Sequence, residues 1–363
     1  MWQSRRHLGS VDWAMLLAAV ALPAIGLVVI YSATVGTPNH GAFERQLMWF
    51  VIGLVAMTVA LAIDYHTLTE FSWVLYGGAA VLLVLTLAFG RVVNASKSWI
   101  GVGGVQFQPS ELAKIATILV VATYLGRESV RGLGFVRFAS LCGLVGFPVL
   151  LILQQPDLGT AATFVPLLAG SAFLAGLRVR TIIALLLIAA LALPIVWGHL
   201  KPYQKERVMI VLEPARDPKG AGYQLIQSLI AVGSGGVTGK GFLAGTQGQL
   251  QFLPEQHTDF IMAVLAEERG FIGSAIVLGL YFLLFYRCVT TARAARDRTG
   301  AFLAMGVACV YGGQTLINIG VVLGILPTTG VPLPLMSYGG SCLVSALIGV
   351  GLVMNVWMRR LVN

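Results

Sequence analysis

Long apolar stretches, each bounded by polar or charged residues, recur along the chain and dominate its pattern. Each stretch approaches the roughly 20 apolar residues that a helix needs to span a membrane. Ten such spans are predicted at residues 13–33, 46–63, 73–90, 110–125, 136–153, 158–176, 181–198, 260–286, 301–324 and 339–358. The pattern predicts an all-α polytopic membrane protein, a single transmembrane domain over 1–363, with one long loop at 199–257 between the seventh and eighth helices.

Composition supports this fold class. The chain is 57% hydrophobic and only 11% charged, whereas a soluble globular protein has about 25% charged residues. The four cysteines lie apart in apolar segments, which indicates neither a disulfide framework nor a zinc site. Soluble classes are therefore excluded.

The basic residues predict the orientation of the chain. Outside the long loop they gather on the side that holds both chain ends, as with Arg5, Arg6, Arg359 and Arg360. The positive-inside rule places this side in the cytoplasm and the long loop outside. The net charge of +9 then reflects topology, and no nucleic-acid partner is indicated.

Four helices that begin on the outer side carry the most distinctive sequences. Their first residues are Gln108-Pro-Ser-Glu-Leu-Ala-Lys114, Gln155-Pro-Asp157, His257-Thr-Asp259 and Pro332-Leu-Pro-Leu-Met-Ser-Tyr-Gly-Gly-Ser341. Proline and short polar residues are ordinary helix-start signals, and capping alone explains any one of them. Four helix beginnings on one face also present free amides that favour an anion such as phosphate. The sequence predicts an outward, anion-binding site.

The eighth helix is predicted to carry a carboxylate at headgroup depth. Thr258 or Asp259 is expected to cap this helix. Counted from the far end of the helix, Glu267–Glu268 lies near the hydrocarbon boundary, and Asp259 lies about 12 Å further out at 1.5 Å per residue. Two neighbours add polarity around Asp259, namely Glu255 and His257. The carboxylate is thus placed to meet the polar end of a lipid.

An ionisable pair is predicted at the start of the fourth helix. Glu111 and Lys114 are three residues apart, so they share a helix face and can pair, while Ser110 can cap the same turn. The pair either braces the helix end or lines a cavity, because ionisable groups at membrane depth usually line a cavity or path. Both readings remain open.

The long loop supplies basic residues and an amphipathic segment. Lys205 and Arg207 lie near its start, residues 223–232 suit the membrane surface, and Lys240 lies in a glycine-rich run. This run lacks the first glycine and the final Ser or Thr of a nucleotide-binding P-loop, so no nucleotide is predicted. Its basic residues are candidates for binding a pyrophosphate.

Together these motifs resemble the SEDS family of bacterial shape, elongation, division and sporulation proteins. The resemblance rests on the four helix beginnings above and on Trp99, Gly222-Tyr-Gln, Ser234-Gly-Gly, Gly239-Lys-Gly241, Leu253-Pro-Glu-Gln-His-Thr-Asp-Phe260 and Glu267-Glu268. Motif order and span number cover essentially the whole chain. Length and short tails favour the elongation branch over the division branch.

The resemblance implies a peptidoglycan glycosyltransferase of the bacterial cytoplasmic (inner) membrane. Such an enzyme polymerises lipid II during elongation and works with a class B penicillin-binding protein among membrane lipids. The essential aspartate of the family falls on Asp259, its paired glutamate and lysine on Glu111 and Lys114, and its Gln-Pro-Asp aspartate on Asp157. His257 and Ser341 belong to the matching motifs and are predicted to support the site.

Asp259 is the candidate catalytic carboxylate, as a general base or as a group that orients the acceptor or binds a metal. The leaving pyrophosphate requires compensating charge. It is expected either from basic residues or from a divalent cation, Mg²⁺ or Mn²⁺, on Asp259, Glu255 and His257. The candidate basic residues are Arg207, Lys205, Lys240 and Lys114.

Two other functions use the same spans. A flippase for lipid-linked cell-wall precursors needs polar residues that continue to the cytoplasmic side, but these residues concentrate at the outer face. A non-catalytic membrane scaffold needs neither Asp259 nor the Glu111–Lys114 pair.

Overall fold

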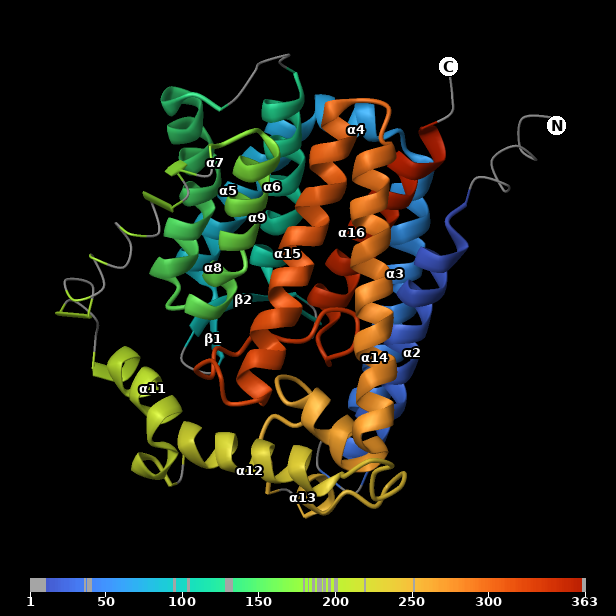
Figure 1. Ribbon diagram of the computed structural model, residues 1–363, viewed down its shortest axis with the longest axis vertical. Coiled ribbons are helices and arrows are strands. Elements are labelled where there is room, and N and C mark those ends of the chain that lie inside the picture. Colours follow the sequence, from blue (N-terminus) through green and yellow to red (C-terminus); the bar gives the residue numbers. More distant parts are fainter. Residues whose placement is uncertain are drawn as a thin grey trace.

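A computed structural model describes residues 11–35, 37, 41–93, 96–102, 105–127, 133–178, 202–218, 220–250 and 252–360, with scattered residues between 180 and 198. Its helices form an upright bundle, shown in Figure 1. The longer helices are α2 (Trp13–Thr34), α3 (Ala42–Ala62), α5 (Ser72–Phe89), α6 (Pro109–Gly126), α7 (Phe135–Gln154), α14 (Ile261–Ala294), α15 (Arg298–Val322) and α16 (Gly340–Arg359). The shorter helices are α4 (Tyr65–Glu70), α8 (Leu158–Ala162), α9 (Val165–Leu174), α11 (Pro202–Leu212), η1 (Pro214–Arg216), α12 (Ala221–Ser234) and α13 (Thr246–Gln249).

Nine of the predicted spans correspond to described helices, and most bounds agree within a few residues. Seven helices of the described chain are long and apolar enough to cross a membrane: α2, α3, α5, α7, α14, α15 and α16. The remaining predicted spans map to α6 and to the shorter α8–α9 pair. The span predicted at 181–198 lies largely outside the described residues.

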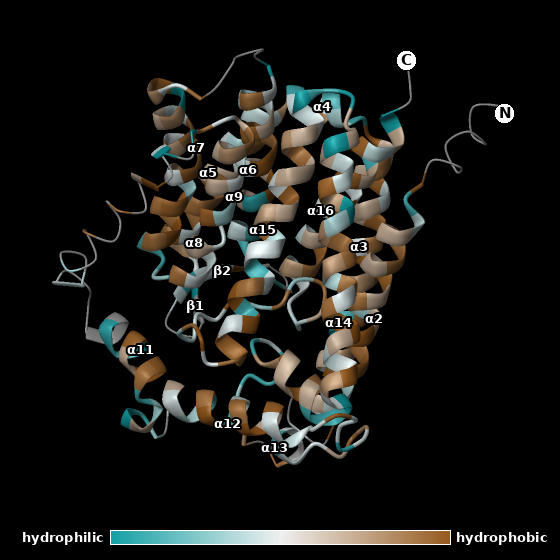
Figure 2. Cartoon of the chain, in the orientation of Figure 1, coloured by the Kyte–Doolittle hydropathy of each residue, from teal (hydrophilic) through white to brown (hydrophobic). Residues whose placement is uncertain are grey.

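The bundle has a buried centre and an apolar exterior. Helices α6, α15 and α16 are buried along most of their length, whereas α3, α5 and α7 expose large apolar side chains such as Val55, Val74 and Phe147. Figure 2 shows hydrophobic residues along the bundle and hydrophilic residues toward its two ends. This distribution suits helices whose outer faces contact lipid.

A small antiparallel sheet between α5 and α6 was not predicted from the sequence. Its strands are β1 (Arg91–Val93), β2 (Ser96–Val102) and β3 (Val105–Phe107), in the order β1-β2-β3. Ser96 Oγ donates a hydrogen bond of 2.8 Å to the carbonyl of Gln155, next to the start of α8. The sheet thus ties the turn before α8 to the chain that leads into α6.

Helix α14 is broken at Gly270, so the span predicted at 260–286 is present but is not one continuous helix. Gly270 has φ +64° and ψ −158°, a conformation that favours glycine. A Cβ there would lie 2.4 Å from the amide nitrogen of Gly239 and 2.6 Å from the carbonyl oxygen of Val237. Figure 1 shows the short first part of α14 meeting its long second part at the lower end of the bundle.

This break also corrects the predicted depth of Asp259. The Glu268 carboxylate accepts a hydrogen bond from Ser32, close to the last residue of α2. The Asp259 carbonyl accepts one from Asn318, about one turn before the last residue of α15. Both residues therefore lie near helix ends. Asp259 directly precedes the unbroken first part of α14, which carries both glutamates, but the break at Gly270 means that this part does not continue the axis of the longer second part. The predicted separation of about 12 Å is therefore not a distance outward along the spanning helix.

The long loop lies across the lower end of the bundle, where Figure 1 places α11, α12 and α13. The amphipathic segment predicted at 223–232 is confirmed as a helix, α12. It buries Leu225 and exposes Leu229 and Ile230. Ser228 Oγ donates a bond of 2.9 Å to the carbonyl of Val322, which fixes α12 to the end of α15.

Candidate functional site

The four distinctive helix beginnings meet in one hydrogen-bonded cluster. The Gln108 amide nitrogen, at the start of α6, donates to Ser341 Oγ of α16 over 3.1 Å. Its side-chain nitrogen Nε2 lies 3.3 Å from Asp157 Oδ2 at the start of α8. The Tyr338 amide donates to the His257 carbonyl over 2.9 Å, which joins the approach to α16 with the approach to α14. Residues far apart in the sequence thus share one site.

Asp259 lies in the turn that enters α14. Its amide donates to the Glu255 carbonyl over 3.2 Å, and its own carbonyl accepts from Asn318 Nδ2 over 2.8 Å. The predicted cap by Thr258–Asp259 is wrong, because Phe260 is the N-cap and makes no side-chain capping bond. The Thr258 hydroxyl instead bonds to Glu255. The Asp259 carboxylate is therefore not used as a helix cap.

Burial raises the pKa of Asp259 to about 7, and the negative charges of Glu255 and Asp157 add to this effect. The positive charge of Arg207, on α11, acts in the opposite direction. Arg207 Nη1 donates to the Thr328 carbonyl over 3.2 Å, which holds the guanidinium in this region. A carboxylate with a pKa near the working pH meets one requirement of a general base.

Asp157 has a structural task and an electrostatic one. It caps α8, accepting hydrogen bonds from the Thr160 amide over 2.9 Å and from the Thr160 hydroxyl over 2.8 Å. Burial raises the pKa of Asp157, while these two hydrogen bonds act to lower it. The negative charge of Glu111 raises it further, and the positive charge of Lys114 lowers it. The predicted capping role is confirmed.

Glu111 and Lys114 form the predicted ion pair. Lys114 Nζ lies 2.8 Å from Glu111 Oε1, and the two side chains are 1% and 3% exposed respectively. Ser345 Oγ donates to Glu111 Oε2 over 2.6 Å. The Ser110 cap is wrong, since Gln108 is the N-cap of α6 and makes no side-chain capping bond. The buried Ser110 Oγ has no hydrogen-bond partner among the described residues.

The two other candidate lysines have partners away from Asp259. Lys240 Nζ lies 2.6 Å from Glu267 Oε1 and 2.8 Å from Thr246 Oγ1. Lys205 Nζ reaches the carbonyl of Gly198 at 3.5 Å, at the limit of a hydrogen bond. Lys205 and Arg207 are two residues apart on α11 and so do not share a helix face. Among the four basic candidates, Arg207 is the one whose charge acts on Asp259.

The candidate metal ligands do not assemble into a cation site. The His257 ring packs against Tyr338, with 5.3 Å between ring centroids, and burial lowers the pKa of His257. Glu255 is exposed, and its carboxylate accepts the Thr258 hydroxyl. Within the described chain, no group of three or more His, Cys, Asp or Glu side chains has a geometry suited to a metal ion.

Sequence reasoning missed two amide side chains of α15, Gln314 and Asn318. Asn318 bonds to Asp259 and Gln314 bonds to Lys114. Both also bond to the chain between α15 and α16, which is called the 323–339 segment below. The available signal was a pair of amide residues inside an otherwise apolar predicted span, since polar groups at membrane depth are usually functional.

A family model described as the FtsW/RodA/SpoVE cell cycle protein matches residues 12–361. The chain belongs to this family. The SEDS resemblance predicted from the motifs is thereby confirmed. The match extends from the approach to α2 to beyond the end of α16, so it includes every residue of the site.

Similar proteins agree with the family assignment. The chain is 43% identical to peptidoglycan glycosyltransferase MrdB of Escherichia coli (strain K12) over 356 residues, covering 96% of this chain and 94% of that protein. A chain of a peptidoglycan synthase complex that coordinates polymerization and crosslinking is similar with a TM-score of 0.83 and 38% identity, covering 97% of this chain and 99% of that one. The rod shape determining protein RodA of Thermus thermophilus gives a TM-score of 0.73 and 31% identity, covering 97% and 98%.

These similarities confirm three predictions: the polytopic helical membrane fold, the likeness to the elongation branch, and the enzyme class of peptidoglycan glycosyltransferase. The chain is a multi-pass membrane protein. The cytoplasmic position of both termini stays a prediction.

Proposed function

We propose that this protein polymerises lipid II into glycan strands at the outer face of the bacterial cytoplasmic membrane during cell elongation. The observation that carries this proposal is the carboxylate of Asp259, whose burial raises its pKa to about 7 within a cluster of four helix beginnings. A carboxylate with a pKa near neutral can take a proton and release it again at neutral pH, which suits a general base in glycosyl transfer.

The reaction is a single displacement. The acceptor hydroxyl oxygen forms a bond to the anomeric carbon of the donor sugar, and the bond from that carbon to the pyrophosphate oxygen breaks. Asp259 takes the hydroxyl proton, and undecaprenyl pyrophosphate leaves with the bonding electron pair. The proton then passes from Asp259 to water or to the leaving group, which restores the carboxylate for the next cycle.

Arg207 is proposed to compensate the charge of the leaving pyrophosphate. Its guanidinium is fixed by the Thr328 carbonyl and acts electrostatically on Asp259. A guanidinium binds phosphate oxygens in a bidentate manner, which favours arginine over lysine for this task. Through Arg207, the 199–257 loop contributes to the active site.

A divalent cation is the alternative source of compensating charge. The predicted ligands Asp259, Glu255 and His257 do not form a ligand group in the described chain, so no step is assigned to a cation. Polymerisation rates measured with and without a chelator decide the matter. A rate unchanged by the chelator excludes an essential exchangeable metal.

Reconstitution with lipid II tests the proposed function directly. The purified protein, supplied with lipid II and no other polymerase, is expected to produce glycan strands that separate by length on a gel. A flippase would move lipid II across a vesicle bilayer without joining it, and a scaffold would do neither. The absence of strands from folded protein would contradict the proposal.

A class B penicillin-binding protein is the proposed partner, together with the surrounding membrane lipids. Support comes from the similar chain in a peptidoglycan synthase complex that couples polymerization to crosslinking. A transpeptidase would receive the strand as it is formed. Co-purification of the two membrane proteins from one membrane extract, with an unrelated multi-pass protein as the control, tests this pairing.

A further inference from the structure

Two buried amide side chains lie on one face of α15. Gln314 and Asn318 are four residues apart, which places them one above the other along the helix. Each is only 1% exposed. A buried amide inside an apolar helix is costly unless it is hydrogen-bonded, so the hydrogen bonds that these two side chains make indicate what they do. Asn318 makes its hydrogen bonds through Nδ2, and its Oδ1 has no partner among the described residues.

Asn318 joins two separate stretches of chain. Its single side-chain nitrogen donates to the carbonyl of Asp259 over 2.8 Å and to the carbonyl of Val331 over 2.8 Å. The first carbonyl belongs to the candidate catalytic residue and the second to the 323–339 segment. The backbone of Asp259 is thereby fixed to that segment through one amide group.

Gln314 makes the matching connection one helical turn away. Its oxygen accepts a hydrogen bond of 2.7 Å from Lys114, the partner of Glu111. Its nitrogen donates to the carbonyl of Pro332 over 2.9 Å. The two amides therefore hold consecutive carbonyls of the 323–339 segment, one toward Asp259 and the other toward the Glu111–Lys114 pair.

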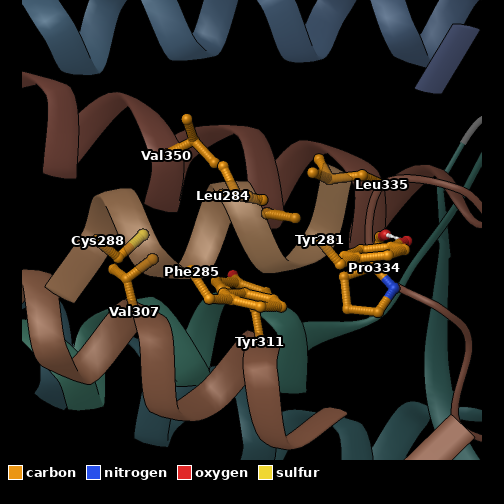
Figure 3. A pocket seen from close by; sticks show the side chains of 10 residues that line it. Tyr281, Leu284, Phe285, Cys288, Val307, Tyr311, Pro334, Leu335 and Val350 are labelled. Atoms are coloured by element: carbon orange, nitrogen blue, oxygen red, sulfur yellow. Dashed lines mark hydrogen bonds between the residues drawn. The ribbon is translucent and has the colours of Figure 1, made fainter. Parts of the chain in front are cut away.

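The same segment is held from another side by α14. Tyr281 donates its hydroxyl to the carbonyl of Pro334, as Figure 3 shows. Ser337 Oγ accepts from the Leu333 amide over 2.8 Å and donates to the Thr258 carbonyl. Just before these anchors in the chain, the amides of α15 hold residues 331 and 332 relative to Asp259.

We propose that Gln314 and Asn318 are positioning residues that place Asp259 for the reaction and link it to the Glu111–Lys114 pair. The inference rests on the proposed function. A misplacement of about 1 Å in a catalytic group can lower a rate by about 100-fold. Neither residue contacts the reacting atoms in this account, so its loss lowers turnover without weakening substrate binding.

The test compares Asn318→Leu with Thr315→Val in the purified full-length protein, with lipid II as substrate. Asn318→Leu removes the donor to two buried carbonyls at similar side-chain volume. Thr315 is a matched control, because it is 4% exposed and, among the described residues, its hydroxyl bonds to the Tyr311 carbonyl of α15 itself over 2.8 Å. We expect kcat to fall about 100-fold in Asn318→Leu with KM within about twofold, and both constants to stay within about twofold in Thr315→Val.

Asn318→Ser keeps a smaller hydroxyl donor and serves where the leucine variant does not fold. It is expected to lose about tenfold in kcat with KM unchanged. A folded Asn318 variant whose kcat stays within about threefold of wild type, or a Thr315→Val loss of the same size, overturns the inference. If wild-type protein itself forms no strands, the proposed function fails instead, so the two failures are distinct.

A separate experiment tests the proposed link between Gln314 and the Glu111–Lys114 pair. Gln314→Leu and Lys114→Met are combined in a double-mutant cycle on kcat. Because Gln314 would act between Lys114 and the 323–339 segment, we expect the double variant to be less impaired than the product of the two single effects. Purely multiplicative losses would remove Gln314 from the proposal.

Discussion

Two lysine–glutamate pairs of the chain have the same chemistry and different surroundings. Lys114 and Glu111 are 2.8 Å apart in the buried first turns of α6, and Lys240 and Glu267 are 2.6 Å apart near the break of α14. Both glutamates are almost fully buried, but Lys114 is 1% exposed and Lys240 is 27% exposed. The location of each pair, and not its residue types, indicates its task.

The neighbours of the two pairs make this difference concrete. The Glu111–Lys114 pair continues through Gln314 to the 323–339 segment and contributes to the pKa of Asp157. Glu267 instead accepts hydrogen bonds from the Lys240 amine, the Thr246 hydroxyl and the Gln247 amide. All three donors belong to the 199–257 loop. The Glu111–Lys114 pair is therefore connected to the candidate site, whereas the Lys240–Glu267 pair joins the 199–257 loop to the first part of α14.

The largest effect is expected from breaking the inner pair. Lys114→Met leaves a buried Glu111 charge without its partner, which typically costs about 3–5 kcal/mol. We expect polymerisation to fall at least about 100-fold, because the loss also disturbs Gln314 and the site. Glu111→Gln combined with Lys114→Met should be less damaged than the two single changes multiplied together. Strict additivity in both rate and thermal stability would show that the two residues do not act as a unit.

A second comparison concerns two basic residues of α11 in the long loop, Arg207 and Lys205. Arg207→Met removes the positive charge that acts on Asp259, and we expect a loss in kcat of about 10- to 100-fold. Lys205→Met is the matched control on the same helix and should stay within about twofold, because its amine contacts only the Gly198 carbonyl among the described residues. Equal losses in the two variants would mean that the loop acts by general positive charge.

The pH dependence of the rate reports the ionisation of Asp259. A general base must be ionised, so kcat/KM should rise with pH and level off above a midpoint near 7, where burial places this pKa. In Arg207→Met the attraction that lowers the pKa is lost, and the midpoint should move to higher pH. A midpoint near 4, the ordinary range of a carboxyl group, would contradict the effect of partial burial on Asp259.

The smallest effect on rate is expected at the outer pair. Lys240→Met leaves Glu267 with the Thr246 hydroxyl and the Gln247 amide as donors. We therefore expect a loss of about 1–2 kcal/mol in unfolding free energy, with turnover of the folded protein within about threefold of wild type. Thermal unfolding and polymerisation are measured on the same preparation. A loss of turnover as large as that of Lys114→Met would abolish the distinction between the two pairs.

Apolar periodicity predicted the spans, because lipid-facing helices need long apolar runs whatever their neighbours are. Spacing also predicted the Glu111–Lys114 pair, since residues three apart meet on any helix. The break of α14 was not predicted, because the run from 260 to 286 contains three glycines, Gly270, Gly273 and Gly279, and nothing local distinguishes Gly270 from the other two. The backbone of residues 237–239, which packs against Gly270, lies far away in sequence.

The partners of Lys240 and Asn318 could not be predicted for the same reason. Lys240 lies in a glycine-rich run that suggested a pyrophosphate-binding role. In the folded chain, however, its amine lies 2.6 Å from the Glu267 carboxylate. Asn318 bonds to carbonyls at positions 259 and 331, which only the folded chain brings together. Spacing along one helix is visible in a sequence, and contacts across the bundle are not.

Polymerisation of lipid II by purified Asp259→Asn protein, measured with its thermal stability at pH 8, tests the central claim most directly. The raised pKa means that ionising Asp259 destabilises the fold as pH rises from about 4 to about 7. The neutral amide should therefore match or exceed wild type in Tm at pH 8 while losing at least about 1,000-fold in rate. Strand synthesis within about tenfold of wild type would contradict the assignment of Asp259 as the catalytic carboxylate.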